Sequence, residues 1–193
     1  MTTALRDVRG PVVARPVPLR VVSLLGSFGR RRPAEVDPVH ALVRRFRAGD
    51  RAAVARVVAA ALAVPEGDRF LPGSSVAAVV VPGHDGAIHA GLAELVRVVG
   101  DAGRWTTADT SVLLRRTPAP EAKLGGSRDP TSEAASLAAD PALLDPRIRT
   151  VLLVDDVLAT GGTIEACVAA LRRDGWQRDV TAVVVAVARW EDA

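Results

Sequence analysis

Val151-Leu-Leu-Val-Asp-Asp-Val-Leu-Ala-Thr-Gly-Gly-Thr163 joins an apolar run, two adjacent carboxylates and a loop of small residues in direct succession. The run at residues 151–154 is short and rich in β-branched side chains, which predicts a strand buried on both faces of a parallel sheet. Asp155 and Asp156 follow at the carboxyl end of that strand. Because carboxylates only accept hydrogen bonds, two of them together suit neighbouring hydroxyl groups such as those of a ribose.

The loop at residues 159–163 leads into a helix that we expect from Ile164 to about Asp174. The first turn of a helix carries unpaired N–H groups and the positive end of the dipole, which favours a bound phosphate. Gly161 and Gly162 let the backbone approach an anion, and nearby threonine hydroxyls add donors. No Gly-Lys pair occurs in the chain, which excludes the G-x-x-x-x-G-K-[ST] loop of nucleoside triphosphatases. The stretch predicts a phosphosugar site, and an ordinary strand-to-helix turn is the alternative.

This stretch resembles the signature with which type I phosphoribosyltransferases bind 5-phosphoribosyl 1-diphosphate (PRPP). The resemblance implies an α/β fold with an open, mainly parallel sheet flanked by helices and a small N-terminal helical hood. It also implies that Asp155 and Asp156 hold the ribose hydroxyls and act in catalysis. The implied 5-phosphate loop consists of Ala159, Thr160, Gly161, Gly162 and Thr163. The implied cofactor is Mg²⁺, held through PRPP and potentially by the two acids, with no dedicated metal ligand.

A second strand-loop-helix unit precedes this one in the chain. Residues 76–81 predict a core strand, and an amphipathic helix running to about Val99 follows the loop after it. By resemblance, the loop residues that grip the diphosphate of PRPP are Gly83, His84, Asp85 and Gly86. The flanking glycines are expected to leave backbone amides free, and Asp85 is also a candidate N-cap for the helix. A solvated His84 is the alternative to a diphosphate contact.

Residues 111–115 predict a further core strand, and the Pro- and Gly-rich stretch at residues 117–130 predicts a mobile loop. The resemblance implies that this loop closes over the active site and shields the reacting sugar from water. Its cations, Lys123 and Arg128, are candidates for catalytic contact with the diphosphate. Lys123 is the only lysine of the chain, so chance placement is the alternative. Arg115 and Arg116, at the end of the strand, are candidates for the same anion.

The remaining pattern predicts a single domain. Apolar residues recur at helical spacing over residues 38–47 and 51–64, with Gly49-Asp50 as the break, so a helical hairpin is expected within residues 36–65. Residues 1–35 are expected to be partly flexible, and residues 75–190 to form the PRPP-binding core. Within that core we expect a short helix at residues 131–139 and a buried strand at residues 180–187.

Composition narrows the possible classes of function. The chain has 193 residues, of which 49% are hydrophobic, and 25 basic against 22 acidic residues give a net charge of +3. Trp105, Trp176 and Trp190 are scattered and there is no tyrosine, so a nucleic-acid partner is not expected. The lone Cys167 excludes a disulfide framework within the chain and a cysteine zinc site, and it favours a cytoplasmic location. No apolar run reaches the roughly 18 residues of a membrane span.

Within the family, the chain is most similar to the ComF-like phosphoribosyltransferases, named after a bacterial competence protein. Residues 41–50 (ALVRRFRAGD) resemble their basic helix and turn, residues 113–117 (LLRRT) the strand before their mobile loop, and residues 181–189 their last strand. Two departures are the absence of a cysteine-rich metal element and the segment GAIHAG at residues 86–91 in place of an Arg-Gly-Phe-Asn-Gln-like one.

The resemblance implies transfer of the 5-phosphoribosyl group from PRPP to a nitrogenous acceptor, a nucleobase or a related small molecule, with release of diphosphate. The alternative is a regulatory or competence-associated protein that senses PRPP or a nucleotide without transfer. The acceptor and the general base stay open, and a homodimer is compatible with either function.

Overall fold

Parallel strands form the central sheet of the computed structural model, which describes residues 20–29, 37–64, 75–107, 114–117 and 134–189. Within these residues the sheet has six strands in the order β1-β8-β7-β3-β4, and β2 also pairs with β8. Its middle consists of β3 (Val76–Val80), β7 (Thr150–Leu158) and β8 (Asp179–Arg189). All three are almost wholly buried, which confirms the predicted α/β class with an open parallel sheet.

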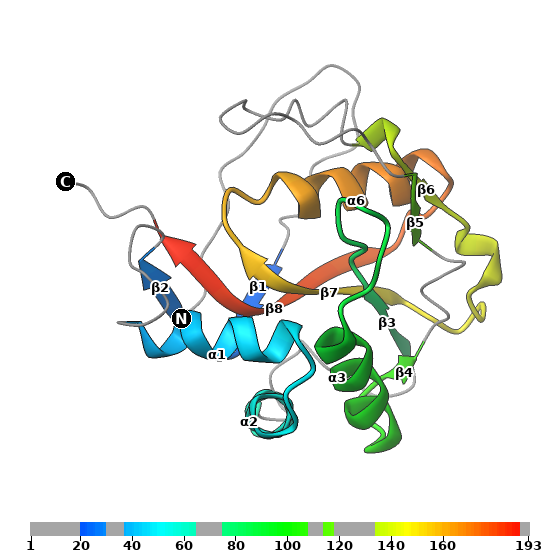
Figure 1. Cartoon of the computed structure of the whole chain (residues 1–193). Coiled ribbons are helices and arrows are strands. Elements are labelled where there is room, and N and C mark those ends of the chain that lie inside the picture. Colours follow the sequence, from blue (N-terminus) through cyan, green and yellow to red (C-terminus); the bar gives the residue numbers. More distant parts are fainter. Residues whose placement is uncertain (1–19, 30–36, 65–74, 108–113, 118–133, 190–193) are drawn as a thin grey trace.

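Helices cover both faces of this sheet (Figure 1). One face carries α1 (Pro38–Arg47), α2 (Arg51–Leu62) and α3 (Ala90–Asp101), and the other carries α6 (Gly162–Arg173). Alternate residues of each strand therefore enter two separate apolar cores. Val80 and Val154 pack in the core with α1, α2 and α3, whereas Val79 and Leu153 pack in the core with α6.

The helical hairpin predicted within residues 36–65 is present, and its start signals are local. Asp37 accepts hydrogen bonds from the backbone N–H groups of Val39 and His40, at 3.0 and 3.1 Å, and so caps α1. Asp50 accepts one from Ala53 N–H at 2.9 Å and caps α2. Side-chain acceptors at these positions satisfy amides that have no partner inside the helix.

Short strands form the two edges of the central sheet. On one edge, β1 (Arg20–Ser23) and β2 (Ser27–Gly29) both run parallel to β8, and a turn at Gly26 with φ of 88° separates them. On the other edge, β4 (Thr106–Thr107) pairs with β3. Residues 20–29 thus belong to the sheet, although the sequence pattern did not predict these strands.

The prediction that residues 111–115 form a strand of the central core is wrong for residues 114 and 115, which are the ones that the structure describes. β5 (Leu114–Arg116) pairs antiparallel with β6 (Leu137–Ala139) in a separate two-stranded sheet, and residues 111–113 lie outside the described part. β6 also replaces the end of the helix expected at residues 131–139. Asp174, just after α6, accepts a hydrogen bond from Ala139 N–H at 2.9 Å. Tertiary contacts with α6, rather than local periodicity, thus select the strand.

The connection before β7 contains only a 3-10 turn, η2 (Pro141–Leu143). Among the described residues, no helix is long and apolar enough to cross a membrane. Trp105 and Trp176 are buried, and their indole N–H groups donate to the backbone oxygens of Val96 and Asp179. Neither ring is therefore placed to stack on a base.

Candidate functional site

The two acids of the sequence motif lie in the last part of β7, which extends beyond the predicted end at Val154. Successive side chains of a strand point to opposite faces, so Asp156 faces the layer of α1 and α3 while Asp155 faces the layer of α6. The acids are nevertheless linked, because the backbone N–H of Asp156 donates to Oδ1 of Asp155 at 2.8 Å. The structure brings them together at the carboxyl end of the central strand.

Asp156 forms an ion pair that the sequence did not predict. Arg47, the last residue of α1, donates from Nε to Oδ2 at 2.5 Å and from Nη2 to Oδ1 at 2.7 Å. His89 Nε2 lies 3.7 Å from the same Oδ2. The Asp156 side chain is only 5% exposed, whereas the Arg47 side chain is 45% exposed. The separation of 109 positions along the sequence explains why no local pattern predicted the pair.

Burial and charge shift the protonation of these groups. The pKa of Asp155 is raised from 3.8 to about 7, mainly because burial disfavours the charged carboxylate and secondly because Asp156 is negative. The hydrogen bond from Asp156 N–H and the charges of Arg47 and Arg116 partly offset this rise. The pKa of Arg47 is raised by its hydrogen bonds to Asp156. The site thus combines Asp155, a carboxyl group that gains a proton readily, with Asp156, a carboxylate that is paired with Arg47.

The predicted phosphate loop follows directly after β7. Ala159 and Thr160 are exposed, and Gly161 has φ of 89°, a left-handed conformation that favours glycine. Gly161 is also the N-cap residue of α6 and has no side chain to cap it, while Thr160 Oγ1 accepts a long hydrogen bond from Gly162 N–H at 3.5 Å. The helix includes Gly162 and Thr163, so it begins two residues before the predicted Ile164. The backbone N–H groups of a helix end thus lie in the loop, as phosphate binding requires.

The predicted diphosphate loop between β3 and α3 is closed by its own hydrogen bonds. Gly83 N–H donates to the oxygen of Ala87 at 2.8 Å, and Gly86 N–H donates to the oxygen of Gly83 at 2.9 Å. The expectation that these glycine amides are free is therefore wrong. His84 and Asp85, at the tip of the loop, are exposed.

Asp85 is also not the N-cap of α3. Its Oδ1 accepts from Ala87 N–H at 2.9 Å, which lowers the pKa of the carboxyl group. This short turn ends at Ala87, and the helix begins only at Ala90 with His89 in the N-cap position. The local turn formed by an aspartate side chain thus competes successfully with helix capping.

The other predicted anion-binding residues lie in two places. Arg116, in β5, is 9% exposed, and its charge acts on Asp155. The backbone of Arg115 belongs to the same strand, but its side chain is not described. Lys123 and Arg128 lie outside the described residues. Of these four residues, Arg116 is therefore the one whose charge the structure connects with the acids.

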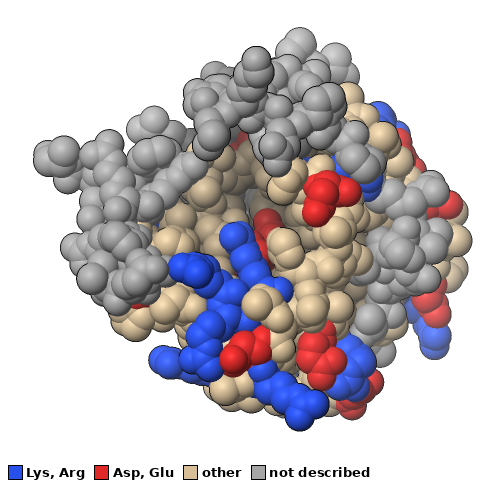
Figure 2. Space-filling view, in the orientation of Figure 1, with Lys and Arg blue, Asp and Glu red and all other residues tan. Residues whose placement is uncertain are grey.

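Basic side chains gather over α1 and its turn into α2, at the rim of a hollow in which acidic atoms are visible (Figure 2). The basic residues of the last turn of α1 are Arg44, Arg45 and Arg47. No group of three or more His, Cys, Asp or Glu side chains suitable for a metal occurs among the described residues. One or two carboxylates nevertheless fit Mg²⁺, because this ion is commonly held by few protein oxygens together with substrate phosphates.

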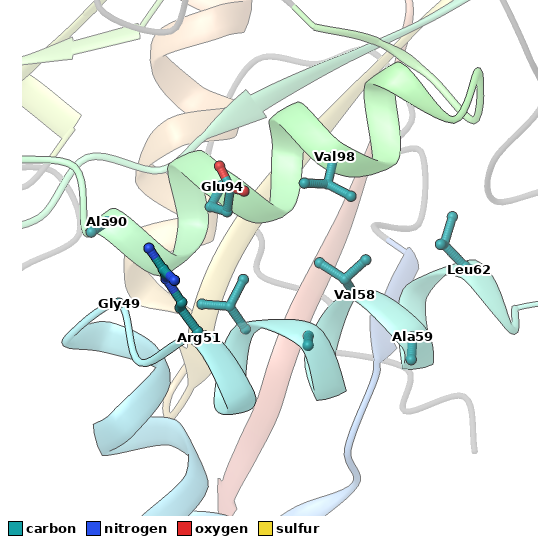
Figure 3. A pocket seen from close by; sticks show the side chains of 10 residues that line it. Gly49, Arg51, Val58, Ala59, Leu62, Ala90, Glu94 and Val98 are labelled. Atoms are coloured by element: carbon teal, nitrogen blue, oxygen red, sulfur yellow. The ribbon is translucent and has the colours of Figure 1, made fainter.

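A separate groove of about 730 Å³ lies between α2 and α3 (Figure 3). Its walls include Val54, Val58 and Val98, with Arg51 and Glu94 as charged residues. None of the residues that line it belongs to the predicted donor site. The groove is therefore distinct from the acids and the phosphate loop.

Comparison with known proteins adds one independent finding. Residues 115–192 match the phosphoribosyl transferase domain, a span that includes β7, the phosphate loop, α6 and β8. No curated protein matches the chain. The matched span contains both acids and the whole predicted 5-phosphate loop, and the parallel sheet agrees with the fold that the resemblance implied. Over residues 115–192, the chain is similar to the phosphoribosyl transferase domain.

Proposed function

We propose that the protein transfers the 5-phosphoribosyl group of PRPP to a nitrogenous acceptor and releases diphosphate. The observation that carries this proposal is the position of Asp155 and Asp156 at the carboxyl end of β7, shortly before the N-terminus of α6. Ligands of open α/β sheets bind at this end of the strands. A ribose beside the acids places its 5-phosphate within reach of residues 159–163.

The residues divide the donor between them. Asp155 and Asp156 accept hydrogen bonds from the ribose hydroxyls, and the backbone of Gly161, Gly162 and Thr163 holds the 5-phosphate. Arg116 contributes positive charge near Asp155. Lys123 and Arg128, in the segment outside the described residues, and the loop with His84 and Asp85 contact the diphosphate in this proposal. These groups position the donor, which is the main requirement for the transfer.

In the reaction, a nitrogen of the acceptor forms a bond to C1 of the ribose while the bond from C1 to the diphosphate oxygen breaks. The diphosphate leaves with the electron pair, and the acceptor nitrogen loses a proton. Positive charge that develops on the ribose is stabilised by the nearby carboxylates. Mg²⁺, when bound, would neutralise the negative charge that develops on the leaving diphosphate. The carboxylate oxygens of Asp155 and Asp156 would suit this ion, together with the phosphate oxygens of the donor.

The alternative is a protein that binds PRPP as a signal and performs no transfer, as a competence-associated regulator could. The closed loop at residues 83–86 favours this alternative, because Gly83 and Gly86 direct their amides to oxygens of the loop itself. The motif at residues 151–163 supports donor binding in both cases.

The test incubates the full chain with PRPP, Mg²⁺ and a panel of purine, pyrimidine and amine acceptors while diphosphate release is measured. PRPP binding is measured in parallel by calorimetry. We expect Asp155→Asn and Asp156→Asn to weaken PRPP binding by about 10- to 100-fold, since each removes charged hydrogen-bond acceptors. Asp179→Asn is the matched control, because Asp179 is exposed and begins β8 at the opposite end of the sheet. Binding without turnover on any acceptor supports the sensor, and no PRPP binding refutes both functions.

A further inference from the structure

Arg47 holds Asp156 with only part of its hydrogen-bonding capacity. A guanidinium group has five N–H donors in a planar fork. Asp156 accepts from Nε and Nη2, so the edge with Nη1 is not used by this carboxylate. The side chain of Arg47 is 45% exposed while that of Asp156 is 5% exposed. Arg47 therefore reaches from a buried carboxylate toward the open side of the site.

The backbone that carries Arg47 is packed tightly against α3. A Cβ atom built on Gly91 would lie 2.1 Å from the backbone oxygen of Phe46, the residue before Arg47. A Cβ atom on Gly49 would lie 3.3 Å from Cβ of Ala90. The end of α1 and the start of α3 are thus in direct contact, and this contact sets where the Arg47 side chain begins.

This contact places Arg47 between the acids and the loop after β3. The backbone N–H of Val81 donates to the oxygen of Val154 at 2.9 Å, so the loop that starts at Gly83 leaves the sheet beside Asp155 and Asp156. The same loop leads into α3, which Arg47 adjoins through Phe46. A diphosphate attached to a ribose on the acids would extend into this space.

We propose that Arg47 is a donor-binding residue: one edge of its guanidinium holds Asp156 in place, and the opposite edge receives the diphosphate of PRPP. This proposal rests on the proposed function. Arginine suits the role because its fork binds carboxylates and phosphates in pairs of hydrogen bonds and keeps its charge. A residue of α1 thereby joins the ribose and diphosphate parts of the donor site.

The experiment compares three probes by calorimetry in the presence of Mg²⁺: PRPP, inorganic diphosphate and ribose 5-phosphate. For Arg47→Gln we expect binding of PRPP and of diphosphate to weaken by about 10- to 100-fold. Binding of ribose 5-phosphate should weaken by a clearly smaller factor, because this probe loses only the support that Arg47 gives to Asp156. Arg47→Lys should give an intermediate loss, because lysine keeps the charge without the fork. In contrast, Asp156→Asn should weaken PRPP and ribose 5-phosphate together. Arg44→Gln is the matched control, since Arg44 is exposed in the same helical turn.

Three results would overturn the proposal while PRPP still binds to the unaltered protein. Arg47→Gln could bind PRPP as well as Arg44→Gln does, it could weaken all three probes equally as a structural residue would, or it could bind PRPP more tightly. Tighter binding would mean that Arg47 competes with the ribose hydroxyls for Asp156. If Arg47→Gln does not fold, Arg47→Lys provides the test. The proposal is overturned if the ratio of its affinity for PRPP to its affinity for ribose 5-phosphate is the same as in the unaltered protein. Failure of the unaltered protein to bind PRPP refutes the proposed function instead, and this proposal with it.

Discussion

Phe46 and Gly91 lie so close that any side chain at position 91 would collide with the backbone of α1. The backbone oxygen of Phe46 is 2.1 Å from the place of a Cβ atom on Gly91, and a ring atom of Phe46 is 3.1 Å from it. Gly91 is therefore required by the crossing of α1 and α3, and not by a special backbone angle. The same crossing brings Arg47 and His89 to Asp156.

Gly91→Ala should force α1 and α3 apart. We expect the free energy of unfolding to fall by about 1–3 kcal/mol, as in other overpacked interiors, despite the better helix propensity of alanine. PRPP binding should weaken as well, because Arg47 moves with α1. Urea denaturation and calorimetry measure the two effects. Ala93→Ser, an exposed change of one atom on the same helix, is the control, and equal stability of the two variants would contradict the prediction.

Asp155 should make the stability of the protein depend on pH between about 4 and 7. The pKa of Asp155 is about 7 in the folded protein, whereas the ordinary value of an aspartate, which applies to the unfolded chain, is 3.8. At a pH between these two values the folded state therefore binds a proton that the unfolded state does not. The contribution of this group to stability is thus fully present below pH 4 and is lost as the pH rises through 7.

The measurement is the melting temperature of the unaltered protein and of Asp155→Asn from pH 5 to 8 in buffer with a chelator. Asparagine stays neutral, so the variant should gain stability relative to the unaltered protein as the pH rises. Asp156, Arg47 and Arg116 act on Asp155 and are the same in both proteins. A difference in melting temperature that stays constant over this range would show that Asp155 does not titrate there.

Gly161→Ala should impair the phosphate loop in addition to destabilising the protein. Its φ of 89° is unfavourable for alanine by about 1–2 kcal/mol. Gly175→Ala is the matched control, because Gly175 follows α6 at its other end with φ of 107° and open space around the added atom. We expect both variants to lose stability in urea, and only Gly161→Ala to lose ribose 5-phosphate binding. Equal binding by both variants would argue against the assigned loop.

Asp37→Ala should loosen the start of α1. The carboxylate accepts from Val39 and His40 N–H groups and, at 3.4 Å, from Gly29 N–H of β2, so its loss should reduce the free energy of unfolding by about 1–2 kcal/mol. Asp37→Asn keeps an acceptor and should retain most of this stability. Chemical denaturation measures the free energy of unfolding of both variants. Equal losses in the two would mean that the negative charge of Asp37, rather than its capping hydrogen bonds, stabilises the protein.

The sequence predicted the elements whose signals are local. The run at residues 151–154 is apolar enough to indicate a strand buried on both faces, and Asp155, Asp156 and the glycines after them follow from the motif itself. The hairpin of α1 and α2 was predictable for the same reason, because helical spacing and the break at Gly49-Asp50 are visible along the chain.

Predictions failed where a strand partner distant in sequence, or a competing local turn, decides the outcome. Residues 114–116 satisfy a strand pattern, yet they pair with β6 beside α6 instead of entering the central sheet. Asp85 has the chemistry of an N-cap, but a turn with Ala87 uses its carboxylate first. The amides of Gly83 and Gly86 are engaged for a similar reason, since the loop folds back on itself.

The sequence by itself determined the motif at residues 151–163, because a strand, two acids and a small-residue loop are contiguous and each acts through its own local chemistry. Only the tertiary structure decided what faces Asp156. Arg47 reaches this carboxylate because Gly91 lets α1 and α3 cross in close contact over the sheet. A buried carboxylate requires a partner of opposite charge, and packing between helices, rather than any spacing along the chain, selects which cation meets it.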